Sequence, residues 1–149
     1  MFTDGACIGN PGPGGWAWAR DKRTYGAGFA PATTNQRMEL TAALEAVRVH
    51  DEGALEVVSD STYVVNCFKA RWWAGWRSRG WKNAKGEQVA NQDLWRPLVQ
   101  LVVDERPGEI IFRWVKGHSG DPMNDLVDRL ANDAARTQAV SGGAGLKYD

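Results

Sequence analysis

The chain has 149 residues, a net charge of zero at pH 7, and 43% hydrophobic and 24% charged residues. This composition excludes a disordered or fibrous protein, and the length fits one domain better than two. No apolar run approaches the roughly 20 residues that cross a bilayer, and no secretion signal stands at the N-terminus. We therefore expect a cytoplasmic, monomeric protein without membrane contact. Cys7 and Cys67 form no CxxC motif, so we expect reduced thiols.

Basic residues are concentrated in one part of this neutral chain. Residues 62–85 include no Asp or Glu, but they include six basic residues and four tryptophans: Lys69, Arg71, Arg77, Arg79, Lys82, Lys85, Trp72, Trp73, Trp76 and Trp81. Clustered cations beside aromatic side chains are typical of surfaces that bind nucleic-acid phosphates. We call residues 69–90 the basic segment, and we expect it to protrude and to be partly helical, with breaks at Gly75 and Gly80.

Three short strands are predicted at the start of the chain. Met1–Asp4 is the first, and the Pro- and Gly-rich stretch Asn10–Gly15 predicts a turn. Trp16–Arg20 and Thr24–Phe29 contain aromatic residues and flank the polar residues 21–23. This pattern favours an antiparallel hairpin.

A strand between two helices is predicted next. Residues 33–35 (Thr-Thr-Asn) can accept hydrogen bonds from the free N–H groups of a helix start. Gly53 ends this helix, Leu55–Ser59 is rich in β-forming residues, and Ser61 can cap the following helix. The first helix has apolar residues at the spacing of one helix face, namely Leu40, Ala43, Leu44 and Val47.

The last third of the chain predicts two helices around one strand. Asn91 caps a helix that follows the basic segment, and Ile110–Val115 is a predicted strand. Asp121 is a good N-cap, and Pro122 suits the first helical position of the last helix. We expect residues 141–149 to be a disordered tail.

This order of elements predicts an α/β fold in which residues 1–140 form a single domain. Three antiparallel strands are followed by parallel strands that are added through helical crossovers. The result is a five-stranded mixed sheet flanked by helices.

Three carboxylates occupy positions that favour chemistry. Asp4 lies in or at the end of the first strand, and Asp60 closes the fourth. If these strands are parallel neighbours, the two side chains lie together at the usual ligand crevice. Glu39, in the first turns of the following helix, can join them. Each residue alone also suits a turn, a cap or a helix dipole, but the three together predict an all-oxygen site for Mg²⁺ or Mn²⁺.

Six short segments form a pattern across almost the whole chain, namely Phe2–Gly5, Gly9–Gly15, Asn35–Leu40, Ser59–Ser61, Trp114–Gly120, and Asn124 with Asp128. In this order they closely resemble the type 1 ribonuclease H family. One segment in isolation is a weak match, whereas six in register are specific.

The resemblance implies a ribonuclease H-like fold and an endonuclease that cuts the RNA strand of RNA/DNA hybrids. It implies catalysis by Asp4, Glu39, Asp60, His118 and Asp128, of which the four carboxylates would hold two Mg²⁺ ions, with Mn²⁺ possible. The expected products carry 5′-phosphate and 3′-hydroxyl ends. Metal ions of this kind act by positioning and by electrostatic stabilisation of the phosphate.

Spacing alone does not identify the fourth carboxylate. The candidates on or beside the last helix are Asp121, Asp125, Asp128 and Asp133, and spacing does not rank them, although Asp125 and Asp128 share a face. The choice of Asp128 rests on the resemblance.

The resemblance also implies two groups of substrate-binding residues. The first reads the 2′-OH and the backbone near the site, and it comprises Gly5, Cys7, Asn10, Thr34, Asn35, Gln36 and Asn124. The second contacts the DNA strand from the basic segment, and it comprises Trp72, Trp76, Arg77, Arg79 and Lys82. Asn10 and Asn35 also suit a turn and a helix cap, and for Trp81 we expect packing onto the body.

Some features depart from the family pattern. Gln36, Thr62 and Ser78 replace residues that many relatives share, and the first strand begins only three residues before Asp4, which predicts a modest loss of stability. Two other functions remain open, namely an enzyme of the same fold that acts on DNA and a non-catalytic hybrid-binding module.

Overall fold

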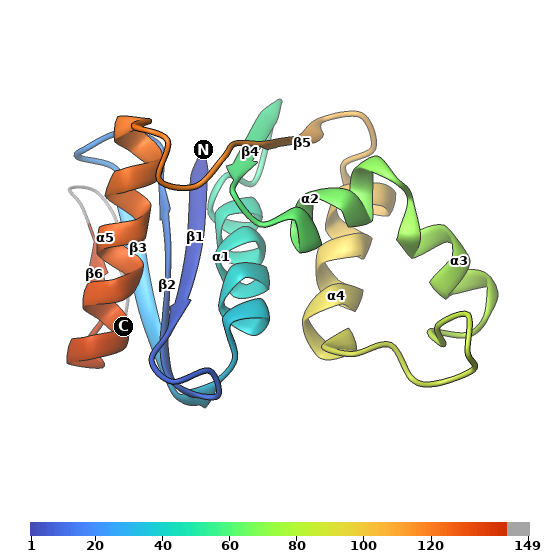
Figure 1. Ribbon diagram of the computed structural model, residues 1–149. Coiled ribbons are helices and arrows are strands. Elements are labelled where there is room, and N and C mark those ends of the chain that lie inside the picture. Colours follow the sequence, from blue (N-terminus) through green and yellow to red (C-terminus); the bar gives the residue numbers. More distant parts are fainter. Residues whose placement is uncertain (143–149) are drawn as a thin grey trace.

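A six-stranded mixed sheet forms the centre of the structure, a computed structural model that describes residues 1–142 (Figure 1). The strand order is β5-β4-β1-β2-β3-β6. Strands β1, β4 and β5 run parallel, whereas the β1-β2, β2-β3 and β3-β6 pairs are antiparallel. The strands are β1 (Phe2–Cys7), β2 (Gly12–Ala19), β3 (Tyr25–Thr33), β4 (Leu55–Ser59), β5 (Ile110–Trp114) and β6 (Ser141–Gly142).

The first two strands are longer than the sequence predicted. Strand β1 continues to Cys7, and the predicted turn Asn10–Gly15 is wrong beyond Pro11, because Gly12 already begins β2. Cys7 pairs with Gly14, so the ladder includes the glycine-rich stretch. The sequence predicted a short first strand and a modest loss of stability from it. In the structure β1 pairs with β2 over six residues but with β4 over only two.

Strand β6 is the sixth strand, where the sequence predicted five. Its two residues pair with Gly26 and Ala27 of β3, in a stretch predicted to be a disordered tail. The rest of that predicted tail lies outside the described residues.

Helices α1 (Asn35–Val49) and α2 (Thr62–Lys69) begin at side-chain caps. The Thr34 hydroxyl accepts from the backbone N–H of Arg37, and the Ser61 hydroxyl accepts from that of Val64. The cap of α1 is thus Thr34, from the predicted group of three residues. The predicted apolar face of α1 is buried, and it joins the main core with residues of α2, α4, β4 and β5.

The helical part after α2 differs from the prediction in two places. Helix α3 (Trp72–Ser78) runs through Gly75 without a break, and the chain turns at Gly80, which has a positive φ. Helix α4 (Gln92–Val99) begins after Asn91, whose side chain makes no cap bond, and passes into the π-helix η1 (Gln100–Glu105). Helix α3 lies at the opposite end of the molecule from α5 (Figure 1).

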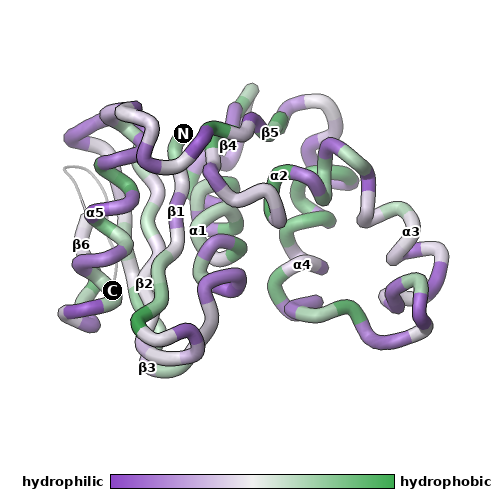
Figure 2. The backbone as a smooth tube through the Cα atoms, in the orientation of Figure 1, coloured by the Kyte–Doolittle hydropathy of each residue, from purple (hydrophilic) through white to green (hydrophobic). Residues whose placement is uncertain are grey.

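Helix α5 (Pro122–Thr137) and helix α1 cover opposite faces of the sheet. Asp121 caps α5 as predicted, accepting from the N–H groups of Met123 and Asn124. Along α5 hydrophilic and hydrophobic residues alternate (Figure 2), which fits a helix with one face on the sheet. That face forms a second core with β2 and β3, made of Ala17, Ala19, Ala27, Val127, Ala131 and Ala134.

Candidate active site

Strand pairing brings Asp4 and Asp60 together. Thr3 of β1 pairs in parallel with Ser59, the last residue of β4. Asp4 is the next residue on β1, and Asp60 directly follows β4. The predicted neighbourhood of the two aspartates is therefore confirmed, although Asp4 lies within its strand and not at the end.

Helix α1 supplies Glu39 because it packs unusually close to β1. A Cβ atom added at Gly5 would lie 2.3 Å from the backbone nitrogen of Glu39, a distance that no side chain could occupy. The glycine after Asp4 thus lets the helix approach until its glutamate faces the aspartate. The backbone N–H of Gly5 also donates to Oδ1 of Asp4 at 2.9 Å.

The three carboxylates form one cluster, in which Asp4 and Glu39 are buried and Asp60 is half-buried. One oxygen of each of Asp4, Glu39 and Asp60 lies within 4.8 Å of the other two. Asp4 is 3% exposed and Glu39 7% exposed, and among the described residues no donor reaches Oε2 of Glu39. Carboxylate oxygens at this spacing, one of them buried and unpaired, fit a hard divalent cation, which would balance their charge.

Burial and mutual repulsion dominate the electrostatics of the three carboxylates. Burial raises the pKa of Asp4 to about 7, opposed by a hydrogen bond with Glu39 and reinforced by the charge of Asp60. Burial, and then the charge of Asp4, raises the pKa of Glu39 well above its ordinary value. Burial also raises the pKa of Asp60. Without a cation, the cluster therefore retains protons that an isolated carboxyl would lose.

The cluster lies in a cavity of about 430 Å³. Asp128 of α5 lines this cavity, and its charge acts on both Asp4 and Asp60. Asp125 instead lines a separate hollow, together with Lys22 and Arg129. The structure thus separates the two aspartates that spacing could not rank.

Two further residues interact with the cluster. His118 lies in the loop before α5, and Asn124 lies in the first turn of α5. His118 lines the cavity, and its charge lowers the pKa of Asp60. Asn124 is 1% exposed, and its side-chain amide also favours the charged form of Asp60. Asn124 is not among the residues that line the cavity, and its interaction with the cluster is with Asp60.

The predicted 2′-OH-reading residues divide into two sets. Gly5, Cys7 and Asn35 line the cavity. Asn10 lies beside it and accepts from the backbone N–H of Asn35 at 3.0 Å, and Thr34 caps α1. Gln36 is exposed in the first turn of α1.

Sequence reasoning missed Ala6 and Asn132, which also line the cavity. The side chain of Asn132 donates to the backbone carbonyl of Asp128 at 2.8 Å and to its Oδ1 at 3.2 Å. It therefore orients the fourth carboxylate. The i,i+4 spacing from Asp128 was a signal in the sequence that could have found it.

The residues of the basic segment that were predicted to contact the DNA strand lie in different environments. Trp72 is 37% exposed. Trp76 instead packs on Trp95 and Trp81, with ring centroids 5.4 and 6.0 Å apart. Lys82 is exposed, and the predicted packing of Trp81 onto the body agrees with its contact with the main core.

The two arginines predicted to contact the DNA strand also lie in different environments. Both terminal nitrogens of Arg77 bind the carboxylate of Asp104, at 2.9 and 2.6 Å. Arg79 is exposed, and its Nε donates to the backbone carbonyl of Lys82. Of the two, Arg79 is the more available to a ligand.

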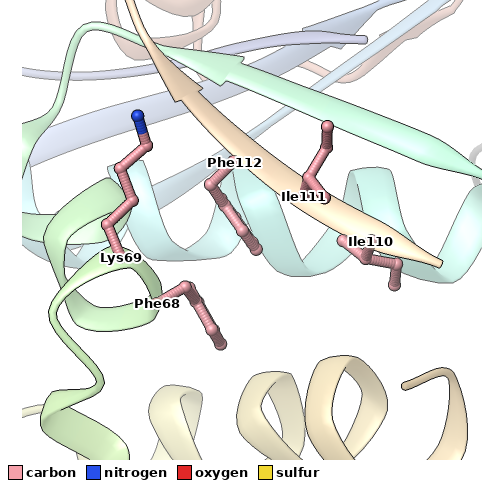
Figure 3. Close-up of a pocket in the computed structure, with 5 residues that line it drawn as sticks. All are labelled: Phe68, Lys69, Ile110, Ile111 and Phe112. Atoms are coloured by element: carbon pink, nitrogen blue, oxygen red, sulfur yellow. The ribbon is translucent and has the colours of Figure 1, made fainter. Parts of the chain in front are cut away.

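A second hollow, beside β5, has a different character (Figure 3). Its volume is about 340 Å³, and it is lined by Phe68, Lys69, Ile110, Ile111 and Phe112. The rings of Phe68 and Phe112 stack with their centroids 4.3 Å apart. Because none of the five lining residues is acidic, this hollow offers no carboxylate to a cation.

An open α/β sheet with clustered carboxylates beside the end of β4 defines a hydrolase that uses divalent metal. The family model for RNase H matches residues 1–136. The chain is 47% identical to the ribonuclease H of Moorella thermoacetica over 138 residues, which cover 90% of this chain and 89% of that one. It is 43% identical to the ribonuclease HI of Caulobacter vibrioides over 140 residues, 91% of each chain. The chain belongs to the ribonuclease H family and is an enzyme of the nuclease class.

Solved structures show the same fold. A crystal structure described as a type 1 RNase H with the type 2 active-site motif superposes with a TM-score of 0.77 at 35% identity, covering 95% of this chain and 74% of that chain. A ribonuclease H1 in complex with an RNA/DNA hybrid superposes with a TM-score of 0.65 at 21% identity, covering 91% of this chain and 95% of that chain. Within residues 1–142, no helix has both the length and the apolar composition of a membrane span.

Proposed function

We propose that this chain is an endonuclease that hydrolyses phosphodiester bonds in the RNA strand of RNA/DNA hybrids by a two-metal-ion mechanism. The observation that carries the proposal is the convergence of Asp4, Glu39 and Asp60 within 4.8 Å, with Asp128 in the same cavity. The relatives named ribonuclease H support the choice of reaction. The hybrid bound to a protein of the same fold supports the choice of substrate.

The four carboxylates would hold the metal ions. Their oxygen donors suit Mg²⁺, which we propose as the cofactor, and Mn²⁺ as a substitute. Bound ions supply electrostatic stabilisation of the phosphate and a water of lowered pKa. Asn124 and Asn132 keep Asp60 and Asp128 in place for this task.

The bond that breaks joins phosphorus to the 3′ oxygen of the RNA. Water adds its hydroxyl to phosphorus, and a proton goes to the departing oxygen, so the products carry 5′-phosphate and 3′-hydroxyl ends. His118 lines the cavity from a glycine-flanked loop. We assign it the transfer of a proton at the phosphate.

Residues around the cavity would distinguish RNA from DNA. The 2′-OH is both donor and acceptor, and the shallow groove of an A-like duplex displays it. Cys7, Asn35 and the backbone of Gly5 line the cavity. Asn10 accepts a hydrogen bond from the backbone of Asn35, and Thr34 and Gln36 are the sequence neighbours of Asn35. We assign this group to the RNA strand.

The basic segment would hold the DNA strand. We assign Trp72, Arg79 and Lys82 to direct contact because they are exposed. Trp76 and Arg77 belong to the same surface but are engaged with the protein itself. Phosphate contacts of this kind fix the position of the duplex and predict an affinity that falls steeply with salt.

The setting that fits this activity is a monomer in the cytoplasm. Both cysteines are free thiols, as expected in a reducing compartment.

One experiment tests the proposed function. The protein is incubated with a labelled RNA/DNA hybrid, duplex DNA and duplex RNA, with Mg²⁺ or with chelator, beside an Asp60→Asn variant. We expect cleavage of the RNA in the hybrid alone, lost with chelator and with the variant. Cleavage of duplex DNA would indicate a DNA-acting enzyme of this fold, and hybrid binding without cleavage would indicate a binding module. Either result would overturn the proposal.

A further inference from the structure

Helix α3, the helical part of the basic segment, has few features that fix its position. It is seven residues long, buries none of them, and has no side-chain bond at its N-cap Arg71. A helix this short is not stable in isolation. Its placement must therefore depend on side chains that reach the rest of the protein.

Aromatic packing and one ion pair hold α3 to the body. Trp76 packs on Trp95 of α4. One residue further along, Arg77 binds Asp104 of η1 with both terminal nitrogens, at 2.9 and 2.6 Å. This second contact links residues 27 positions apart, from the protruding helix to the π-helix.

The guanidinium of Arg77 is also held from its face. Its Cζ lies 5.4 Å from the ring centroid of Trp73, and that of Arg71 lies 5.2 Å from the same ring. Trp73 in turn packs against the main core. A bidentate ion pair combined with stacking fixes both the plane and the direction of an arginine side chain.

This arrangement leaves Arg77 poorly placed to bind a phosphate. Bidentate recognition of phosphate uses the same paired N–H groups that Asp104 already occupies. Asp104 also offsets the positive charge that would attract the phosphate. Arg79, by contrast, has no ion pair among the described residues.

We propose that Arg77 and Asp104 form an anchor that sets the position of α3 against the body. Arg77 is then a positioning residue for the hybrid-binding surface and not a phosphate ligand, and Asp104 contributes to hybrid binding although it is acidic. This inference rests on the proposed function, because it concerns how the hybrid is held.

The test compares hybrid affinity in Arg77→Gln, Asp104→Asn and the double variant. Affinity is measured at several salt concentrations in an Asp60→Asn background, so that the RNA stays uncut. Arg79→Gln is the matched control because it removes an arginine without an acidic partner. Cleavage kinetics are measured separately with Asp60 intact.

We expect both single variants to bind the hybrid about three- to tenfold more weakly, as for the loss of a well-aligned ion pair. The double variant should bind no more weakly than either single one, because each removes the same contact. The salt slope of Arg77→Gln should match the parent, whereas that of Arg79→Gln should fall by about 0.9. With Asp60 intact, KM should rise at unchanged kcat.

Two results would overturn the anchor. Tighter binding by Asp104→Asn, with a lower salt slope for Arg77→Gln, would make Arg77 a phosphate ligand that Asp104 restrains. Parent-like affinity in both single variants would show that the pair does not position the surface. Failure of the parent to prefer hybrid over duplex DNA would instead count against the proposed function, so the two failures are distinguishable.

Discussion

Gly117 lies directly against Asp60: a Cβ atom at position 117 would be 2.8 Å from Oδ2 of that carboxylate. The loop before α5 therefore approaches the cluster at a point where an added side chain would press on the carboxylate of Asp60. The same loop places His118 on the cavity wall. A methyl group at Gly117 must move either the loop or the carboxylate.

We predict that Gly117→Ala lowers hybrid cleavage at least tenfold while the fold is retained. Misplacement of a catalytic group by a fraction of an ångström is enough for such a loss. The measurement is single-turnover cleavage together with thermal melting. Full activity with an unchanged melting temperature would show that this close approach does not position Asp60.

The metal-free protein should lose stability as pH rises from about 4 to about 7. The folded-state pKa of Asp4 is about 7, above its ordinary 3.8, so in this range the folded state binds more protons than the unfolded chain. Stability then falls with rising pH. Asp93 and Asp104 have lowered pKa values because of their arginine partners. The stability that these two ion pairs add is therefore constant above about pH 4 and is lost only at lower pH.

Thermal melts in chelator across this pH range check the prediction. Added Mg²⁺ should restore stability near pH 7, because the ion replaces the protons. A melting temperature that rises steadily from pH 4 to pH 7 without metal would contradict the sign of the effect.

Glu39→Gln should stabilise the metal-free protein at pH 7 and abolish cleavage. At pH 7 the folded protein must hold this carboxyl either charged beside Asp4 or protonated above its ordinary pKa, and glutamine removes that cost at nearly constant volume. We expect a rise in melting temperature of about 3 °C or more, equivalent to about 1 kcal/mol. At pH 4, where the native carboxyls carry protons, the gain should disappear. An equal gain at both pH values would point to a cause other than charge.

Alanine substitutions at Trp72 and Trp76 should affect hybrid affinity and folding stability to different degrees. Trp72→Ala should weaken hybrid binding with the smaller change in melting temperature, since the side chain is 37% exposed and touches only the edge of the aromatic cluster, with its ring centroid 6.2 Å from that of Trp76. Its exposed surface can stack on a base or sugar. Trp76→Ala should cost about 3 kcal/mol of folding free energy, because this ring packs on Trp95. Affinity measurements beside melts of both variants check this, and a reversed order of effects would refute the assignment.

Local sequence patterns predicted most of the fold. The caps Ser61 and Asp121 and the apolar face of α1 depend on residues close in sequence, so they can be found without tertiary information. The stretch Gly12–Gly15 could not, because its conformation is set by pairing with β1 and not by the turn preference of glycine and proline. Gly75 was misjudged for the same reason, since α3 is held by distant contacts.

The site was predictable to a different degree for each carboxylate. Asp4 and Asp60 follow from strand order, and Glu39 from its helix. Asp128 needed the resemblance, because its distinction from Asp125 depends on how α5 rotates on the sheet. The pairing of Arg77 with Asp104 had no signal in the sequence, since no local pattern links positions 27 residues apart.

The most direct test of the carboxylate site compares Asp128→Asn with Asp125→Asn, three residues earlier on α5. Single-turnover cleavage of a hybrid is measured over a range of Mg²⁺ concentrations. We predict that Asp128→Asn loses activity by about a hundredfold or more at ordinary Mg²⁺ levels, whereas Asp125→Asn matches the parent throughout. Equal activity in the two variants, or cleavage that persists in chelator, would contradict a metal-binding site built from Asp4, Glu39, Asp60 and Asp128.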